Sequence, residues 1–142
     1  MKYLLDTNVF REIGKTSPHK NLETWLIGVD DAELAISALT VREVAKGIAL
    51  LKGTKPAVAK EIERRVQSVF DAFEGRTLPV DRAVAQVWGT MLGDSGKHAD
   101  DAAFAATACV HGLVLVTRNV QDFKARGVPV LNPYKFPPER AS

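Results

Sequence analysis

The sequence contains a single cysteine and no long hydrophobic run. One cysteine, Cys109, cannot form an internal disulfide, which favours a reducing, cytoplasmic compartment. We expect Cys109 to be a small core residue rather than a nucleophile. The first apolar run, Tyr3 to Leu5, stops at Asp6, so a secretory signal peptide is not expected. No stretch approaches the ~20 apolar residues that a membrane-spanning helix requires, and no membrane partner is expected.

The chain also lacks a strong charge of either sign. Its 19 basic and 17 acidic residues give a formal net charge of +2, which permits nucleic-acid binding without arguing for it. The length of 142 residues fits one domain, 1–142, with a short C-terminal tail at about 133–142. Apolar residues make up 46% and charged residues 25%, as in ordinary soluble globular proteins.

Short β-branched or apolar runs alternate along the chain with helical patterns. The runs at 3–5, 33–37, 77–80, 113–117 and 128–131 predict strands. Apolar residues recur every three or four positions over 58–73 and 84–92, and a third helix is expected from Asp101 to His111, closed by Gly112. Alternating strands and helices predict an α/β fold, with helices on both faces of a mainly parallel sheet in three layers. Ligand sites in such folds form beyond the carboxyl ends of the strands.

Four acidic residues need a common explanation. Asp6 ends the first strand, Glu43 follows the second, and Asp122 lies just past the apolar strand at 113–117. Asp101 opens an alanine-rich helix. Three of the four therefore follow strand ends, where an open α/β sheet places its ligands.

Each acid also has a purely structural interpretation. Asp6 could cap the next helix, and Thr40 with Glu43 fits a capping box. Asp101 could favour the positive end of a helix dipole, as could its neighbour Asp100. Asp122 would fall in a first helical turn, with Asn119 as the N-cap. Taken together, these four interpretations do not predict that three of the acids follow strand ends.

Metal binding does predict that clustering. Two unit charges 4 Å apart repel by roughly 4 kcal/mol at an effective dielectric of 20, so clustered carboxylates need shared protons or a divalent cation. Oxygen ligands select Mg²⁺ or Mn²⁺ over zinc, and no histidine–cysteine arrangement has zinc spacing. His98 is expected to be a surface residue rather than a ligand.

These segments resemble the PIN-domain ribonucleases, and within them the VapC-type toxins of toxin–antitoxin pairs. Leu4 to Val9 resembles the family's opening strand with its first acid, and Ile36 to Val44 its serine–threonine–glutamate segment. Asp101 to Ala108 is similar to its third acid with the following Ala-Ala-Thr-Ala helix. Leu115 to Phe123 is similar to its threonine–arginine–asparagine motif with the last acid. The four motifs occur in the family's order and cover residues 3 to 123.

The resemblance implies both a site and an activity. It implies that Thr7 and Asn119 are supporting polar groups. It also implies that the metal is coordinated by four acids: Asp6, Glu43, Asp101 and Asp122. The implied activity is endoribonuclease cleavage of RNA by a metal-activated water, leaving 5′-phosphate and 3′-hydroxyl ends. One departure is the compact approach to the third acid, Gly96 to Ala99, and another is Asp100, which could rival Asp101.

The resemblance also implies partners, namely a small antitoxin protein and a second copy of the chain in a homodimer. A homodimer would also cover apolar residues on helical faces that exceed what a thin sheet must bury, although a single core could also bury them. These residues are Trp25, Leu26, Val66, Val69 and Phe70.

Two other functions remain as alternatives. One is a non-catalytic PIN-fold module that binds RNA or protein, and intact acids at all four motif positions disfavour it. The other is a phosphatase with an aspartyl nucleophile, which Asp6-Thr7-Asn8 disfavours because the second aspartate of such enzymes is missing.

Overall fold

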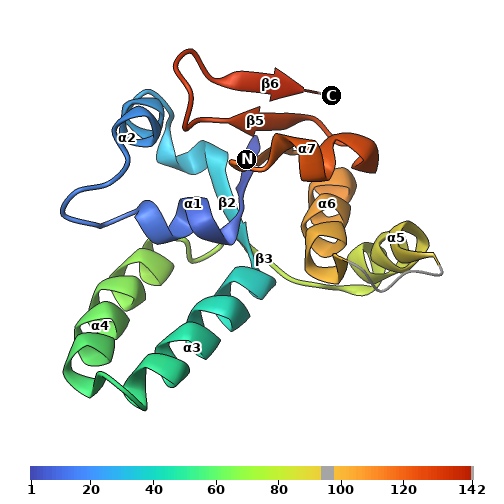
Figure 1. Ribbon diagram of the computed structural model, residues 1–142. Coiled ribbons are helices and arrows are strands. Elements are labelled where there is room, and N and C mark those ends of the chain that lie inside the picture. Colours follow the sequence, from blue (N-terminus) through green and yellow to red (C-terminus); the bar gives the residue numbers. More distant parts are fainter. Residues whose placement is uncertain (94–97, 142) are drawn as a thin grey trace.

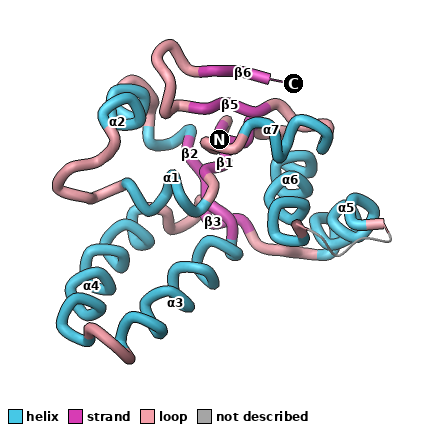
Figure 2. The backbone as a smooth tube through the Cα atoms, viewed as in Figure 1, coloured by secondary structure: helices cyan, strands magenta, loops and turns pink. Residues whose placement is uncertain are grey.

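The computed structural model describes residues 1–93 and 98–141. In this part of the chain six strands form one sheet in the order β3-β2-β1-β4-β5-β6 (Figures 1 and 2). The strands are β1 (Tyr3–Leu5), β2 (Leu34–Ser37), β3 (Thr77–Leu78), β4 (Val114–Val116), β5 (Val130–Asn132) and β6 (Glu139–Ala141). The helices are α1 (Thr7–Glu12), α2 (Lys20–Ile27), α3 (Ala38–Lys52), α4 (Pro56–Ala72), α5 (Arg82–Leu92), α6 (Ala99–His111) and α7 (Val120–Phe123), with short 3₁₀ turns at Asp31–Glu33 and Lys124–Arg126.

The first five strands are parallel, and β6 is antiparallel to β5. β1 lies between β2 and β4 and is paired on both sides. Its three residues are buried because helices cover both faces. Alternate side chains of a strand point to opposite faces, and Leu4 packs into one hydrophobic cluster while Tyr3 and Leu5 pack into the other. The predicted parallel sheet is therefore confirmed.

Different helices cover the two faces of the sheet. The cluster around Leu4 includes Phe104 of α6 and Phe123 of α7, with Trp88 of α5 packed against it. The opposite cluster includes Phe10 of α1 and Val66 of α4. Each cluster lies between the sheet and one layer of helices. The predicted three-layer α/β/α fold is therefore confirmed.

Helices α3 and α4 form a hairpin that extends away from the sheet (Figure 1). α4 begins with Pro56 in its first turn, where a missing backbone N–H costs nothing. Near the tip of the hairpin, Leu50 is 69% and Val58 49% exposed. These two side chains are therefore apolar surface that the monomer does not bury.

Three findings differ from the sequence analysis. The expected tail contains β6, which pairs with β5 through Leu131 and Arg140. Cys109 is exposed rather than in the core, because the buried run of α6 ends at Ala108. The five apolar residues considered for a dimer interface all belong to the core cluster or pack against it: Trp25, Leu26, Val66, Val69 and Phe70.

Two further expectations, for Gly112 and His98, are confirmed. Gly112 ends α6 with a positive φ of 64°, as expected for its C-terminal glycine. His98 is largely exposed, as predicted. Gly96 and Lys97, on the approach to the third acid, lie outside the described residues. Among those that are described, no helix is long and apolar enough to cross a membrane.

Candidate active site

Asp6 lies where β1 ends and α1 begins, and only 8% of its surface is exposed. One of its carboxylate oxygens, Oδ1, accepts a hydrogen bond from the backbone N–H of Val9 at 2.9 Å, so Asp6 is the N-cap of α1. The other oxygen accepts a short hydrogen bond from the hydroxyl of Thr117. Burial raises the pKa of Asp6, and the negative charge of Glu43 raises it further, while the hydrogen bonds oppose this. The capping interpretation is thus correct, and it leaves lone pairs on both oxygens for a cation.

Glu43 does not form the capping box that its spacing suggested. α3 begins at Ala38, and its N-cap is Ser37, whose hydroxyl accepts from the N–H of Leu39 at 3.0 Å. Thr40 is inside the helix and fully buried, and its hydroxyl lies 3.1 Å from that of Thr7. Glu43 therefore lies in the second turn of α3 and is not needed as a cap.

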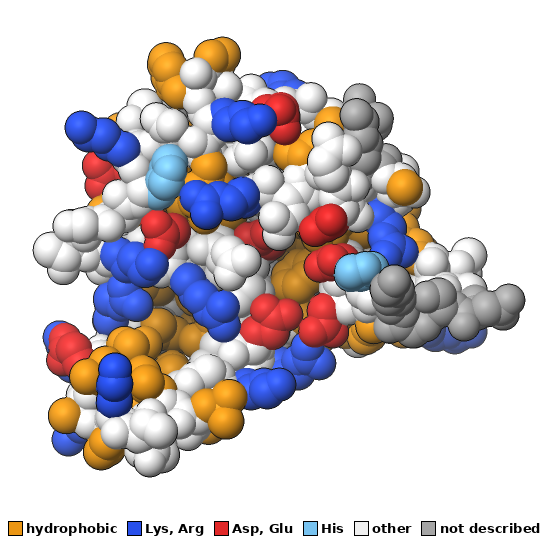
Figure 3. All heavy atoms as spheres, viewed as in Figure 1, with side chains coloured by type: hydrophobic (Ala, Val, Ile, Leu, Met, Phe, Trp, Pro, Cys, Tyr) orange, Lys and Arg blue, Asp and Glu red, His pale blue; other side chains and the backbone are white. Residues whose placement is uncertain are grey.

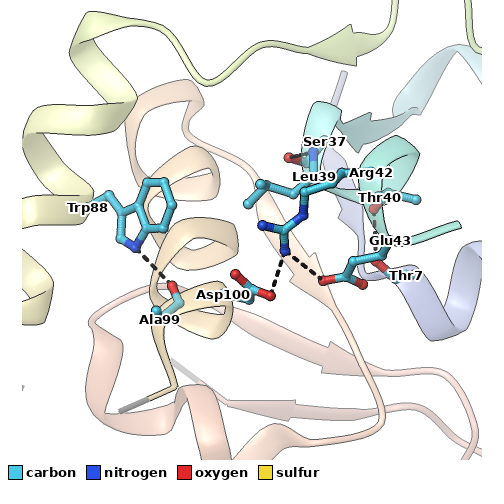
Figure 4. A network of polar contacts seen from close by, with 9 residues as sticks. All are labelled: Thr7, Ser37, Leu39, Thr40, Arg42, Glu43, Trp88, Ala99 and Asp100. Atoms are coloured by element: carbon cyan, nitrogen blue, oxygen red, sulfur yellow. Dashed lines mark hydrogen bonds and ion pairs between the residues drawn. The ribbon is translucent and has the colours of Figure 1, made fainter. Parts of the chain in front are cut away.

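The hydroxyl pair of Thr7 and Thr40 joins α1 to α3 (Figure 4). Both side chains are buried, so this contact fixes how the helix that carries Glu43 sits against the helix that Asp6 caps. Thr7, which the sequence suggested as a supporting polar group, thus contacts protein on this side.

Asp100 and Asp101 have different surroundings. Nη2 of Arg42 donates to Oδ2 of Asp100 at 2.7 Å and lies 4.0 Å from Oε1 of Glu43. Figure 4 shows this guanidinium between the two carboxylates, joining α3 to the start of α6. Asp100 is thus already paired with a cation.

Asp101 instead faces the last acid of the series. Burial raises the pKa of Asp101, and the charge of Asp122 raises it further, opposed by the more weakly acting His98 and Arg126. Asp122 lies in the first turn of α7, as predicted, with its backbone N–H bonded to the carbonyl of Asn119 at 3.1 Å. This difference between neighbours favours Asp101 over Asp100 as the site acid.

Thr117 is a residue that the sequence analysis missed. It follows β4 and is fully buried. Its hydroxyl donates to Asp6 and accepts the backbone N–H of Asn119 at 3.1 Å. Its position two residues before Asn119 is the signal that could have revealed it, because a threonine hydroxyl commonly bonds the N–H two residues on. Thr117 therefore joins the loop that leads to Asp122 to the first acid.

The predicted acids lie near one another in pairs, because the charge of Glu43 acts on Asp6 and the charge of Asp122 acts on Asp101. Acidic side chains gather around a hollow on the face drawn in Figure 3, with lysine and arginine side chains around them. Among the residues that the structure describes, no three His, Cys, Asp or Glu side chains are close enough to hold a metal ion as they stand. The oxygen-only donor set and the raised pKa values of Asp6 and Asp101 fit a divalent cation.

A parallel sheet with acids at the carboxyl ends of its strands defines an α/β domain suited to binding a cation there, and comparison with known proteins identifies the family. The PIN-domain family model matches residues 3–128. Toxin FitB of Neisseria gonorrhoeae is 37% identical over 137 residues, covering 92% of this chain and 97% of that protein. VapC ribonuclease Y4jK of Sinorhizobium fredii is 31% identical, covering 93% and 97%.

Solved structures agree with this match. The crystal structure of FitAcB from Neisseria gonorrhoeae has a TM-score of 0.82 at 34% identity, covering 93% of this chain and 98% of that chain. A toxin–antitoxin complex from Klebsiella pneumoniae has a TM-score of 0.70 at 25% identity, covering 94% and 99%. The chain therefore belongs to the PIN-domain family and, within it, to the VapC-type ribonuclease toxins of toxin–antitoxin systems.

Proposed function

We propose that this protein is an Mg²⁺- or Mn²⁺-dependent endoribonuclease whose metal is held by four carboxylates: Asp6, Glu43, Asp101 and Asp122. The proposal is supported by the proximity of Asp6 to Glu43 and of Asp101 to Asp122, with Arg42 between Glu43 and the start of α6. Burial raises the pKa values of Asp6 and Asp101, and the charge of a nearby acid, Glu43 or Asp122, raises each further. A fold retains such repulsion where a cation is to be bound.

A bound divalent ion supplies positive charge to the phosphate and lowers the pKa of an attacking water. The chain's own part is to hold the ligands in place. Val9 and Thr117 fix the two oxygens of Asp6, and the buried Thr7–Thr40 contact fixes the helix of Glu43. Asn119, exposed next to Asp122, supports the site as a polar group at its rim.

We propose an antitoxin protein and a second copy of this chain as partners. FitAB and the Klebsiella pneumoniae complex are toxin–antitoxin assemblies of relatives at 36% and 25% identity, which supports the first partner. Support for a homodimer comes from exposed apolar side chains such as Leu50 and Val58 at the tip of the α3–α4 hairpin. The five core residues considered earlier do not support it.

Cleavage by the purified protein tests the central proposal. Single-stranded RNA is incubated with the protein in Mn²⁺ or in EDTA, alongside p-nitrophenyl phosphate as a small phosphomonoester. We expect cleavage of RNA in Mn²⁺, no cleavage in EDTA, and no hydrolysis of the monoester. RNA binding without cleavage would instead identify a non-catalytic binding module.

Two matched variants show whether the proposed acids are responsible. Glu43→Gln removes one charged ligand and should reduce cleavage by at least about 100-fold, the effect of losing one strong electrostatic contribution to a transition state. Glu63→Gln makes the same change at an exposed acid of α4 that pairs with Lys52, and it should cleave like the wild type. Equal activities of the two variants would refute a role for Glu43.

A further inference from the structure

A second hollow, of about 530 Å³, lies directly beside the proposed metal site. Asn119 and Asp122 line one side of it, and Arg118, His19 and Tyr134 line the rest. Its volume is within the range of about 300–1,000 Å³ that is common for small-ligand sites. Whatever occupies this hollow is therefore adjacent to the acids.

The hollow contains a cation in a fixed position. The guanidinium carbon of Arg118 lies 4.0 Å from the centre of the Tyr134 ring, a distance at which the ring face attracts the charge. The Arg118 side chain is exposed. Its guanidinium makes no hydrogen bond or ion pair with residues 1–93 or 98–141. Its donors are thus available to an anion. Lys135, also at the rim, differs because it pairs with Glu139 at 2.8 Å.

The platform beneath Arg118 is held rigidly from below. Oδ1 of Asn132 accepts the backbone N–H of Tyr134 at 2.9 Å, and its amide donates to the carbonyl of Arg118 at 3.4 Å. The amide of Asn21 donates to the carbonyl of Tyr134 at 2.8 Å. One buried asparagine therefore connects the cation and the ring that supports it.

His19 forms the remaining wall. Its ring packs edge-on against Tyr134, with centroids 4.9 Å apart. Its Nδ1 is the one buried side-chain nitrogen or oxygen in the described part of the chain that has no hydrogen-bond partner. Buried polar atoms usually have partners, so an unpaired one beside a hollow indicates a place where a ligand or water completes the structure.

We propose that this hollow binds one nucleotide of single-stranded RNA next to the scissile phosphate, with its phosphate on Arg118 and its base against Tyr134 and His19. The inference rests on the proposed RNA substrate and adds to it the position of a flanking nucleotide. RNA fits better than an acidic peptide because, among the described residues that line the hollow, Arg118 lies beside aromatic side chains, and unstacked bases pack on such side chains. Its continuity with Asp122 places that nucleotide beside the cleaved bond.

Binding and turnover are measured separately, so that the two proposals can fail independently. Binding uses a fluorescein-labelled, mixed-sequence 12-nucleotide RNA in EDTA, followed by anisotropy at several salt concentrations. Turnover uses kcat and KM for the same RNA in Mn²⁺. Arg118→Gln is compared with Arg82→Gln, which removes an exposed arginine at the start of α5. Tyr134→Leu, which removes the ring, is compared with Tyr134→Phe, which keeps it.

We expect Arg118→Gln to raise both Kd and KM about tenfold, the effect of losing one charge-assisted hydrogen bond. The slope of log Kd against log salt should fall by about 0.7, the value for one phosphate contact on a single strand. The value of kcat and the affinity for Mn²⁺ should stay within about twofold. Tyr134→Leu should also raise Kd, and by more than Tyr134→Phe, while Arg82→Gln should match the wild type.

Other results would overturn the inference. An unchanged Kd and salt slope in Arg118→Gln would remove the phosphate contact. Parallel losses of kcat and Mn²⁺ affinity would assign Arg118 to the metal site instead. If the variant loses affinity for a labelled glutamate-rich peptide while keeping its affinity for RNA, the hollow is a protein-docking site. A wild type that binds RNA with the expected salt slope but does not cleave it would refute the proposed function and leave the nucleotide site standing.

Discussion

Replacing Asp6 with asparagine separates its two roles, because asparagine is also a good helix N-cap. The new side chain keeps an oxygen for the N–H of Val9. Its amide nitrogen, however, cannot accept the hydrogen bond that the Thr117 hydroxyl donates to Asp6. Losing that hydrogen bond costs about 1 kcal/mol. The substitution should therefore perturb folding only slightly.

Removal of the charge acts in the opposite direction. Because burial raises the pKa of Asp6 in the folded protein above its unfolded value, ionisation opposes folding. The stability that Asp6 contributes is complete at low pH and is lost as the pH rises through the raised pKa. At pH 7 without metal, Asp6→Asn removes this penalty. The two effects offset one another, and we expect a Tm within about 4 °C of the wild type, equivalent to ~1 kcal/mol for a domain of this size.

Added Mn²⁺ should distinguish the wild type from Asp6→Asn by its effect on Tm. A ligand at 100 times its Kd stabilises the folded state by about 2.7 kcal/mol, which is roughly 10 °C in Tm. We expect thermal unfolding in Mn²⁺ to show this rise for the wild type and little of it for Asp6→Asn. Asp81→Asn is the matched control, because Asp81 caps α5 in the same way, through the N–H of Val84. If Asp6→Asn gains as much from Mn²⁺ as the wild type, Asp6 is only a helix cap.

Further outcomes follow from the same geometry. Asp101→Asn should abolish RNA cleavage while Asp100→Asn, whose acid pairs with Arg42, keeps much of it; the reverse ranking in a cleavage assay would overturn the motif register. Since the pKa values of Asp6 and Asp101 are raised, Mn²⁺ affinity measured by calorimetry should begin to weaken at a higher pH than it would for ordinary aspartates. An affinity that does not change down to about pH 4 would contradict this. Ser37→Ala should cost about 1 kcal/mol in urea unfolding as a lost N-cap, and no loss would mean that α3 is capped elsewhere. Light scattering should give a dimer at micromolar concentration, and a monomer would refute the proposed homodimer.

The sequence predicts the centre of this fold better than its edges. Buried parallel strands are apolar throughout, so β1 and β4 could be located from composition alone. The edge strand β6 reads Glu-Arg-Ala and carries no such signal, because exposed edge strands are commonly charged. Cys109 was misplaced for a related reason, since sequence does not show where α6 extends beyond the sheet.

The candidate acids could be predicted, but their local contacts could not. Ser37 and Thr40 are both suitable helix caps, and spacing to Glu43 favoured Thr40. In the structure Ser37 is the cap, because the Thr40 hydroxyl is taken up by a buried tertiary contact with the hydroxyl of Thr7. Thr7 lies 33 residues from Thr40 in the sequence. The sequence also left open whether Trp25 of α2 faces the core, and the structure shows its ring packed edge-on against that of Tyr3.

The strand order has a consequence for how the protein is made. β4 pairs with β1 and β5, yet it is synthesised more than 100 residues after β1. A ribosome-bound chain that ends before residue 114 therefore has an incomplete sheet and lacks Asp122. Proteins are synthesised at about 5–20 residues per second, so for about 1–3 seconds the growing chain contains Asp6, Glu43 and Asp101 but not yet the whole of β4. An enzyme that cuts RNA thus acquires its proposed site only after β4 and Asp122 have been synthesised.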